Sequence, residues 1–133
     1  MNVLNWSNLL SVGVREIDEQ HKVLVGLLNR LGAADKNDAQ VCTQVLTQLL
    51  EYVQHHFAFE ERLMNEHAYA DAEAHVRAHR DLAAQVLRMA GQHGGTEAVS
   101  IDALTVFLRQ WLVGHIMNTD RRLGAALNRA GVH

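Results

Sequence analysis

The sequence of 133 residues contains no proline, one cysteine and few aromatic residues, and it has no long apolar run. The absence of proline favours uninterrupted helices, because proline breaks a helix interior. The single cysteine, Cys42, excludes a disulfide-stapled scaffold, and we expect it to be buried as a small apolar residue. A membrane span needs about 20 consecutive apolar residues. We therefore expect no membrane insertion.

The charges are nearly balanced, with 12 Lys and Arg against 15 Asp and Glu. This leaves no basic excess of the kind that binds nucleic acid, so no nucleic-acid partner is expected. The amino-terminal stretch lacks a basic segment followed by an apolar run, so the default compartment is the cytoplasm. The length suits one domain, residues 1–133.

Apolar residues recur at helical spacing in four segments, which are residues 18–31, 38–65, 71–91 and 100–119. Asp18 and Asp38 are the expected N-caps, and Gly32 is the expected stop after the first helix. Residues 1–17 are predicted to form a non-helical arm, residues 91–96 a loop, and the chain end a short helix. This pattern predicts an all-α, up-down-up-down four-helix bundle.

Each predicted helix carries a seam of inward-facing residues at three- and four-residue spacing, and every seam contains histidine. The seams are Ile17, His21, Leu24, Leu28 and Leu31; Leu46, Leu49, Val53, His56, Glu60 and Leu63; His75, His79, Leu82, Val86 and Met89; and Ile101, Leu104, Leu108, Trp111 and His115. A buried polar group without a partner costs about 1–3 kcal/mol. Several together would cancel the stability of a typical domain, so the histidines are expected to bind metal.

The spacing of the polar seam residues agrees with shared ligation. His56 and Glu60 are four residues apart, as are His75 and His79, which places each pair on one helix face. A seventh residue, Asp120, follows His115 by five positions, which is about 140° around an ideal helix. Asp120 therefore either approaches from another direction or requires a looser helix.

The composition of the ligand set restricts which metal ions can bind. Five histidines and two carboxylates are too many for one tetrahedral zinc and too rich in nitrogen for magnesium or calcium. Imidazole with carboxylate suits iron. Two six-coordinate irons that share both carboxylates and one oxygen atom would keep one position open for a small molecule.

Four motifs together resemble the hemerythrin family and, within it, the single-domain bacteriohemerythrins. They are Ile17-Asp18-Glu19-Gln20-His21, His56-Phe57-x-x-Glu60-Glu61, His75-x-x-x-His79, and Trp111-Leu112-x-x-His115-Ile116-x-x-x-Asp120. The resemblance extends over about residues 6–123. It implies a dioxygen-binding domain with two irons, Fe²⁺ or Fe³⁺, joined by an oxo or hydroxo bridge.

The same resemblance implies a role for each motif residue. His75, His79 and His115 would hold one iron, His21 and His56 the other, and Glu60 and Asp120 would bridge them. An apolar oxygen pocket would consist of Phe57, Trp111, Leu112 and Ile116. Two positions depart from the family's frequent aromatic residues, because Leu82 and Leu123 stand there.

The remaining histidines are expected to be solvent-exposed; these are His55, His67, His93 and His133. Three function classes stay open: reversible dioxygen binding for storage, transport or delivery to an oxygen-consuming enzyme; a diiron enzyme acting on peroxide or nitric oxide; and an oxygen or redox sensor that acts through a partner. Five neutral imidazoles stabilise high-valent iron less than carboxylate-rich sites do. The expected function is therefore oxygen binding without catalysis.

Overall fold

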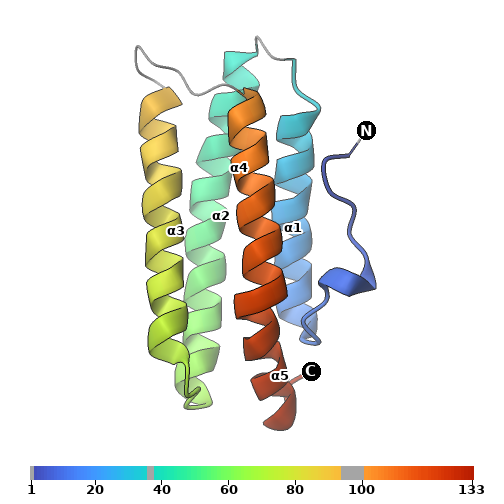
Figure 1. Ribbon diagram of the computed structural model, residues 1–133, viewed down its shortest axis with the longest axis vertical. Coiled ribbons are helices and arrows are strands. Elements are labelled where there is room, and N and C mark those ends of the chain that lie inside the picture. The colour runs from blue at the N-terminus through green and yellow to red at the C-terminus, as the bar shows by residue number, and fades with distance from the viewer. Residues whose placement is uncertain (1, 36–37, 94–100) are drawn as a thin grey trace.

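The computed structural model describes residues 2–35, 38–93 and 101–133, with backbone alone at residues 90–93 and 101. Every regular element in these ranges is helical. The elements are the 3₁₀ turn η1 (Asn8–Leu10), the α-helices α1 (Arg15–Gly32), α2 (Ala39–Glu66), α3 (Ala72–His93) and α4 (Ile101–Gly114), the π-helix η2 (His115–Asp120), and α5 (Arg121–Arg129). Figure 1 shows α1 to α4 running alternately up and down, which confirms the predicted bundle.

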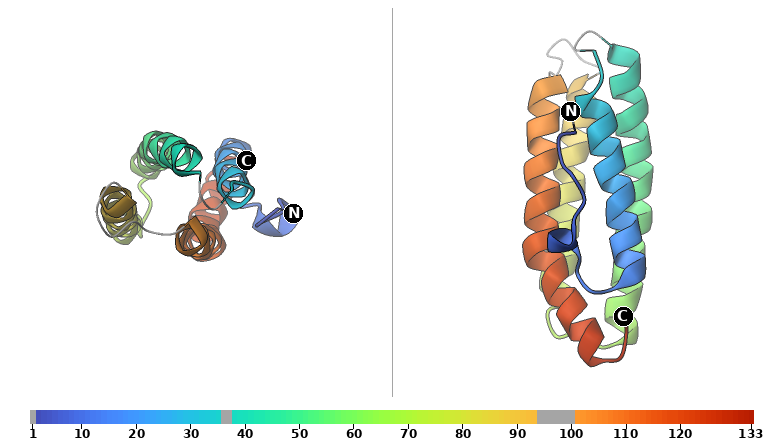
Figure 2. Two further views of the ribbon diagram at one scale, coloured as in Figure 1. Left: turned by 90° about the horizontal axis from the view of Figure 1, so that it is seen from above. Right: turned by 90° about the vertical axis from the view of Figure 1, so that its right-hand side faces the viewer.

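The four long helices enclose one elongated core. In the view along the bundle axis, α1 lies beside α2 and α4, and α2 lies beside α3 (Figure 2). Most predicted seam residues are buried, and so is Cys42. Leu63, Leu82 and Met89 are only half-buried and pack against this core. The side chain of Ile101 lies outside the described residues.

The amino-terminal arm lies along the groove between α1 and the α4–α5 segment (Figure 2). Near its start, Leu4 and Asn29 exchange two hydrogen bonds, of 3.0 and 2.8 Å. Near its end, the amide of Asn128 donates to the carbonyl of Gly13 at 2.9 Å. The arm therefore closes one side of the bundle, as an irregular segment can when side chains satisfy its backbone.

The prediction that Asp18 caps the first helix is wrong. Helix α1 begins at Arg15, and its N-cap position is held by Val14 without a side-chain hydrogen bond. The carboxylate of Asp18 instead accepts hydrogen bonds from the hydroxyl of Ser11, at 2.5 Å, and from the backbone N–H of Val12, at 2.9 Å. Asp18 thus fixes the end of the arm against the first turn of α1.

Gly32 ends α1 as predicted, but for a different reason. Gly32 was expected to follow the helix as its C′ residue, but it is the last residue of α1, its φ is not positive, and Ala33 is the C-cap. A side chain at position 32 would instead collide with Val3 of the arm. Gly124 in α5 similarly leaves room for the backbone of Val12. Both glycines allow the arm to approach the helices closely.

The other boundaries follow the prediction with two changes. Asp38 caps α2, since its carboxylate accepts from the N–H of Val41 at 3.1 Å. Helix α3 continues to His93, beyond the predicted end at residue 91; residues 94–96 of the predicted loop lie outside the described part. The fourth helix changes to a π-helix at His115. Among the described helices, none is both long and apolar enough to cross a membrane.

Candidate metal centre

Seven polar side chains converge inside one half of the bundle. They are His21 from α1, His56 and Glu60 from α2, His75 and His79 from α3, and His115 and Asp120 from η2. Within the described part of the chain, no other polar or charged side chain is buried. The structure therefore brings together all seven residues that the sequence indicated.

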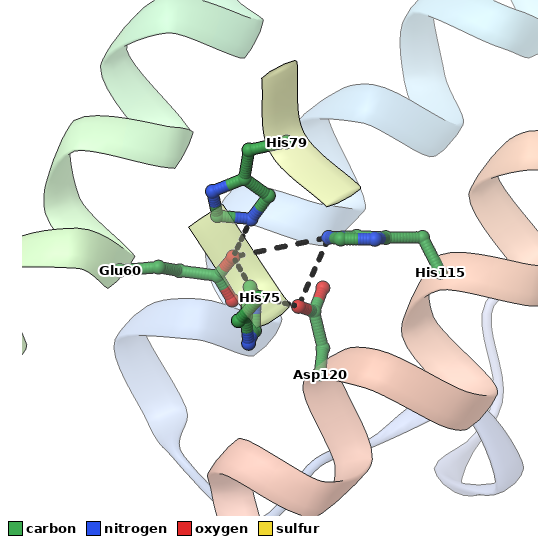
Figure 3. A group of neighbouring side chains, drawn as sticks. All are labelled: Glu60, His75, His79, His115 and Asp120. Atoms are coloured by element: carbon green, nitrogen blue, oxygen red, sulfur yellow. Dashed lines mark hydrogen bonds and ion pairs between the residues drawn. The ribbon is translucent and has the colours of Figure 1, made fainter. Parts of the chain in front are cut away.

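The seven residues form two overlapping groups. In one group, Glu60 and Asp120 meet the histidines of α3 and η2; Figure 3 shows these five side chains facing one another. In the other group, the same two carboxylates meet His21 and His56. Within each group, one ligand-type atom per residue lies within 4.8 Å of the others. Each carboxylate therefore faces two metal-sized sites at once.

The π-helix explains how Asp120 reaches the site. Five residues of an α-helix would turn its carboxylate about 140° away from His115. A π turn bonds residue i to residue i+5 and so returns the fifth residue to nearly the same face. His115 Nε2 accordingly lies 3.0 Å from Asp120 Oδ1. Of the two alternatives that the sequence left open for Asp120, the structure shows the looser helix.

The two carboxylates stay ionised although they are buried. Burial and the charge of Asp120 act to raise the pKa of Glu60, but hydrogen bonds from His115, His75 and His79 lower it to about 2. Burial also acts to raise the pKa of Asp120, and the charge of His115 with further histidine contacts holds it well below its usual value. The two carboxylates therefore bring negative charge to the centre of the site.

The histidines differ in their affinity for protons. Burial lowers the pKa of His56 to about 4, so this ring is neutral. Burial also acts to lower the pKa of His75 and His115, but the adjacent carboxylates raise it to about 8 and about 10. In the metal-free chain, two imidazolium rings thus supply the positive charge that the carboxylates require.

The residues present fit metal ions. Among the described side chains, buried atoms without a hydrogen-bond partner concentrate at this site and include Nε2 of four histidines: His21, His56, His75 and His115. Nε2 of neutral His56 lies 3.5 Å from Glu60 Oε1. Two lone pairs facing each other in this way are stabilised by a cation between them. The histidine and carboxylate set is suitable for transition metals.

The four predicted pocket residues are all buried beside the polar centre. The ring of Phe57 stacks on His79, with centroids 3.8 Å apart and planes inclined by 5°. The indole of Trp111 lies nearly parallel to His115, with centroids 6.1 Å apart. Leu112 and Ile116 are buried in the adjoining core. Phe57 and Trp111 therefore place apolar rings directly against two of the histidines.

Sequence reasoning missed two polar residues that contact the histidines from outside. Gln20 Oε1 lies 2.7 Å from Nδ1 of His56. Glu61 Oε2 lies 3.8 Å from Nδ1 of His79, and the Glu61 side chain is 37% exposed. Gln20 directly precedes the seam residue His21, and Glu61 directly follows the seam residue Glu60. This adjacency was the sequence feature from which both could have been predicted.

The remaining histidines lie away from the centre. His55, His67 and His133 are exposed, as predicted. His93 belongs to α3 and not to a turn, and its side chain lies outside the described residues. None of the three exposed rings belongs to either metal-type group.

Comparison with known proteins agrees with this geometry. Residues 12–127 match the family model described as the hemerythrin HHE cation binding domain. The chain belongs to the hemerythrin family. It is similar to the bacteriohemerythrin of Stenotrophomonas maltophilia, with 33% identity over 122 residues that make up 91% of this chain and 79% of the relative. The myohemerythrin of Theromyzon tessulatum is 30% identical over 115 residues, 86% of each chain.

The fold is likewise that of solved hemerythrins. A wild-type hemerythrin crystal structure superimposes with a TM-score of 0.86 at 31% identity, covering 94% of this chain and 98% of that one. The family membership and the buried cluster together support a metal-binding protein whose family binds dioxygen at two irons.

Proposed function

We propose that this protein binds dioxygen reversibly at a non-heme diiron centre held by the seven buried residues. His75, His79 and His115 would hold one iron, and His21 and His56 the other. Glu60 and Asp120 would bridge the two. This assignment uses both groups of ligand-type atoms and places each carboxylate where it contributes to both.

The observation that carries the proposal is the sharing of Glu60 and Asp120 between the two groups. A single metal would use only one group and would leave buried imidazoles unsatisfied, at a cost of about 1–3 kcal/mol each. The three-histidine group offers one more nitrogen ligand than the two-histidine group. The iron beside His21 and His56 is therefore the one with an open position.

The surroundings favour binding over catalysis. When bound, two ferrous irons supply the electrons that make dioxygen binding favourable. Phe57 and Trp111 place apolar rings against His79 and His115. Among the described residues, no further acid or base is buried, and the buried thiol of Cys42 belongs to neither ligand group. A cavity of about 10 Å³ adjoins Trp111 and Leu112, and apolar side chains line it. This environment suits a small apolar gas.

The visible spectrum tests the proposal. Anaerobic protein loaded with ferrous iron should develop a ferric charge-transfer band when air is admitted, and the band should disappear when oxygen is removed. Glu66→Ala, which removes an exposed carboxylate of α2, should behave like the wild type. Steady consumption of peroxide or nitric oxide would support an enzyme instead. A partner that binds only one oxygenation state would indicate a sensor.

The cytoplasmic location, the absence of nucleic-acid partners and an oxygen-consuming recipient enzyme remain predictions from the sequence. So does the assignment of residues 1–133 to one oxygen-binding domain. The recipient enzyme alone depends on the oxygen chemistry above, because delivery requires a reversible adduct.

A further inference from the structure

The five histidines of the centre all point the same ring nitrogen inward. In each of them Nε2 lies within 4.0 Å of a carboxylate oxygen of Glu60 or Asp120. A ring that binds metal through Nε2 carries its hydrogen on Nδ1, the outward nitrogen. The partner of Nδ1 fixes the tautomer and the orientation of the ring. The outward contacts are therefore part of the site.

The outward nitrogen of His56 has a strong partner. Gln20 Oε1, half-buried on α1, lies 2.7 Å from Nδ1 of His56 on α2. An amide oxygen only accepts hydrogen bonds, so Nδ1 must carry the hydrogen. Nε2 then presents its lone pair toward Glu60, 3.5 Å away. Gln20 thereby holds His56 in the tautomer that can bind a cation through Nε2, and it does so without a bound cation.

The outward nitrogen of His79 faces a carboxylate. Glu61 Oε2 lies 3.8 Å from Nδ1, slightly beyond hydrogen-bonding distance. In the metal-free chain, Nε2 of His79 lies 3.0 Å from Glu60 Oε1. When a cation takes Nε2, the ring hydrogen must be on Nδ1, and there it faces Glu61. The stacked ring of Phe57 keeps the imidazole in this plane.

The other outward nitrogens lack a hydrogen bond like that of His56. Within the described part of the chain, Nδ1 of His21, His75 and His79 has no hydrogen-bond partner, but Nδ1 of His79 has the carboxylate of Glu61 3.8 Å away. A side-chain acceptor therefore hydrogen-bonds His56 in the two-histidine group, and a carboxylate lies near His79 in the three-histidine group. One acceptor is a neutral amide and the other is a carboxylate.

We propose that Gln20 and Glu61 are positioning residues of opposite electrical character, one for each metal. Gln20 orients His56 without adding charge, and Glu61 orients His79 while adding a negative charge beside the three-histidine metal. A negative charge there stabilises the more oxidised ion. The difference would make the two metals unequal beyond their unequal number of histidines. This inference rests on the proposed two-metal centre.

The contribution of Gln20 is tested first in the metal-free protein, by ¹⁵N NMR of the histidine rings. Wild-type His56 should be a single Nδ1–H tautomer, and Gln20→Leu should give a mixture. Gln20→Glu should restore the single tautomer, because it keeps an acceptor. The matched control is Gln48→Leu, which removes an exposed amide acceptor from α2. A single Nδ1–H tautomer in Gln20→Leu would overturn the assignment. This measurement needs neither iron nor oxygen, so it is independent of the proposed function.

Metal affinity gives a second readout. In a Co²⁺ titration, Gln20→Leu should weaken one of two binding steps by about 10- to 100-fold, the range typical for loss of a ligand's hydrogen-bond partner. Gln20→Glu should bind within a few-fold of the wild type. Two unchanged binding steps in Gln20→Leu would contradict the positioning role. This result would count in the same way if the protein did not bind dioxygen, because the titration measures metal affinity alone.

The contribution of Glu61 is tested by the reduction potential of the iron-loaded protein. Glu61→Gln keeps an acceptor and removes the charge, so it should retain both irons and raise the potential. Gln20→Glu should lower it. The matched control is Glu66→Gln, which removes an exposed charge from the same helix. Equal potentials in Glu61→Gln and Glu66→Gln would overturn the role of Glu61, and an unchanged potential in Gln20→Glu would overturn that of Gln20.

Discussion

The two halves of the bundle are built on different principles. The half that contains the end of α1 and the start of α4 is filled by aliphatic side chains such as Leu28, Leu31, Leu46 and Leu104. The half that contains the start of α1 and η2 encloses seven buried polar groups. The helices are continuous from one half to the other, yet their seams change from leucine to histidine and carboxylate.

The comparison shows which half is self-sufficient. Aliphatic side chains contribute about 25 cal/mol for each Å² that they bury and need no specific partner. Buried imidazoles and carboxylates lose their hydration and regain stability only through cations or hydrogen bonds. The apolar half therefore specifies the bundle, whereas the polar half depends on what it binds.

Removing a shared ligand should have the largest effect. Glu60→Ala deletes the carboxylate that belongs to both ligand groups, so the variant should lose the dinuclear centre. Iron analysis of the purified variant measures this. Glu66→Ala is the control, because it removes an exposed carboxylate of the same helix, and it should retain two irons. Two irons in Glu60→Ala would refute the ligand assignment.

Removing the metals should destabilise the polar half. Several buried groups would lose their compensating charge at about 1–3 kcal/mol each. The melting temperature of chelator-treated protein should fall by more than about 10 °C, given a few degrees for each kcal/mol. Calorimetry of both forms measures the change. Equal melting temperatures would show that the fold does not depend on the metals.

A cavity in the apolar half should destabilise the fold without disturbing the metals. Leu31 is fully buried, so Leu31→Ala should cost about 2–5 kcal/mol in unfolding free energy. Iron content should stay at the wild-type value, since the residue lies in the other half of the bundle. Urea titration and iron analysis test the two statements separately. Loss of iron from the folded variant would show that the halves are coupled.

The stability of the polar half should depend on pH more strongly when metal is absent. The pKa of His75 is raised to about 8 and that of His115 to about 10, both above the usual value near 6.5. Their contribution to the stability of the metal-free fold is thus complete below about pH 6.5 and is lost as the pH rises through 8 and 10. Urea titrations at pH 6.5 and 9 should show this loss in metal-free protein and a smaller loss in iron-loaded protein. The same loss in both forms would contradict the prediction.

The smallest effect is expected for exposed charges. Glu73 and Arg77 form a solvent-exposed ion pair of 3.7 Å on α3. Arg77→Ala should change the unfolding free energy by no more than about 0.5 kcal/mol, because water screens such pairs. Thermal denaturation at low and high salt checks this. A loss above 1 kcal/mol would show that α3 depends on its surface charges.

Periodicity predicted most of the fold because the seams repeat at fixed intervals. It placed His21, His56 and Glu60 on inward faces, and the structure confirms this. Local contacts were harder to predict. Asp18 has the chemistry of an N-cap, but the arm uses its carboxylate for Ser11 and Val12, which no helical pattern encodes.

The candidate site was predicted where ligand spacing matches a helical turn. His75 and His79 follow that rule, whereas Asp120 depends on the π-helix. The sequence indicated this only indirectly, because five residues of an α-helix would turn Asp120 about 140° away from His115. Gln20 was missed because its role depends on the distance between α1 and α2. Spacing along one helix reveals ligands, but the orientation of those ligands depends on neighbouring helices.

The central claim is that the polar half of the bundle is a site for two irons. Elemental analysis of purified protein, expressed with iron and zinc both available, tests it most directly. The account predicts two irons for each chain. A single zinc for each chain, or protein that folds with neither metal at an unchanged melting temperature, would contradict it.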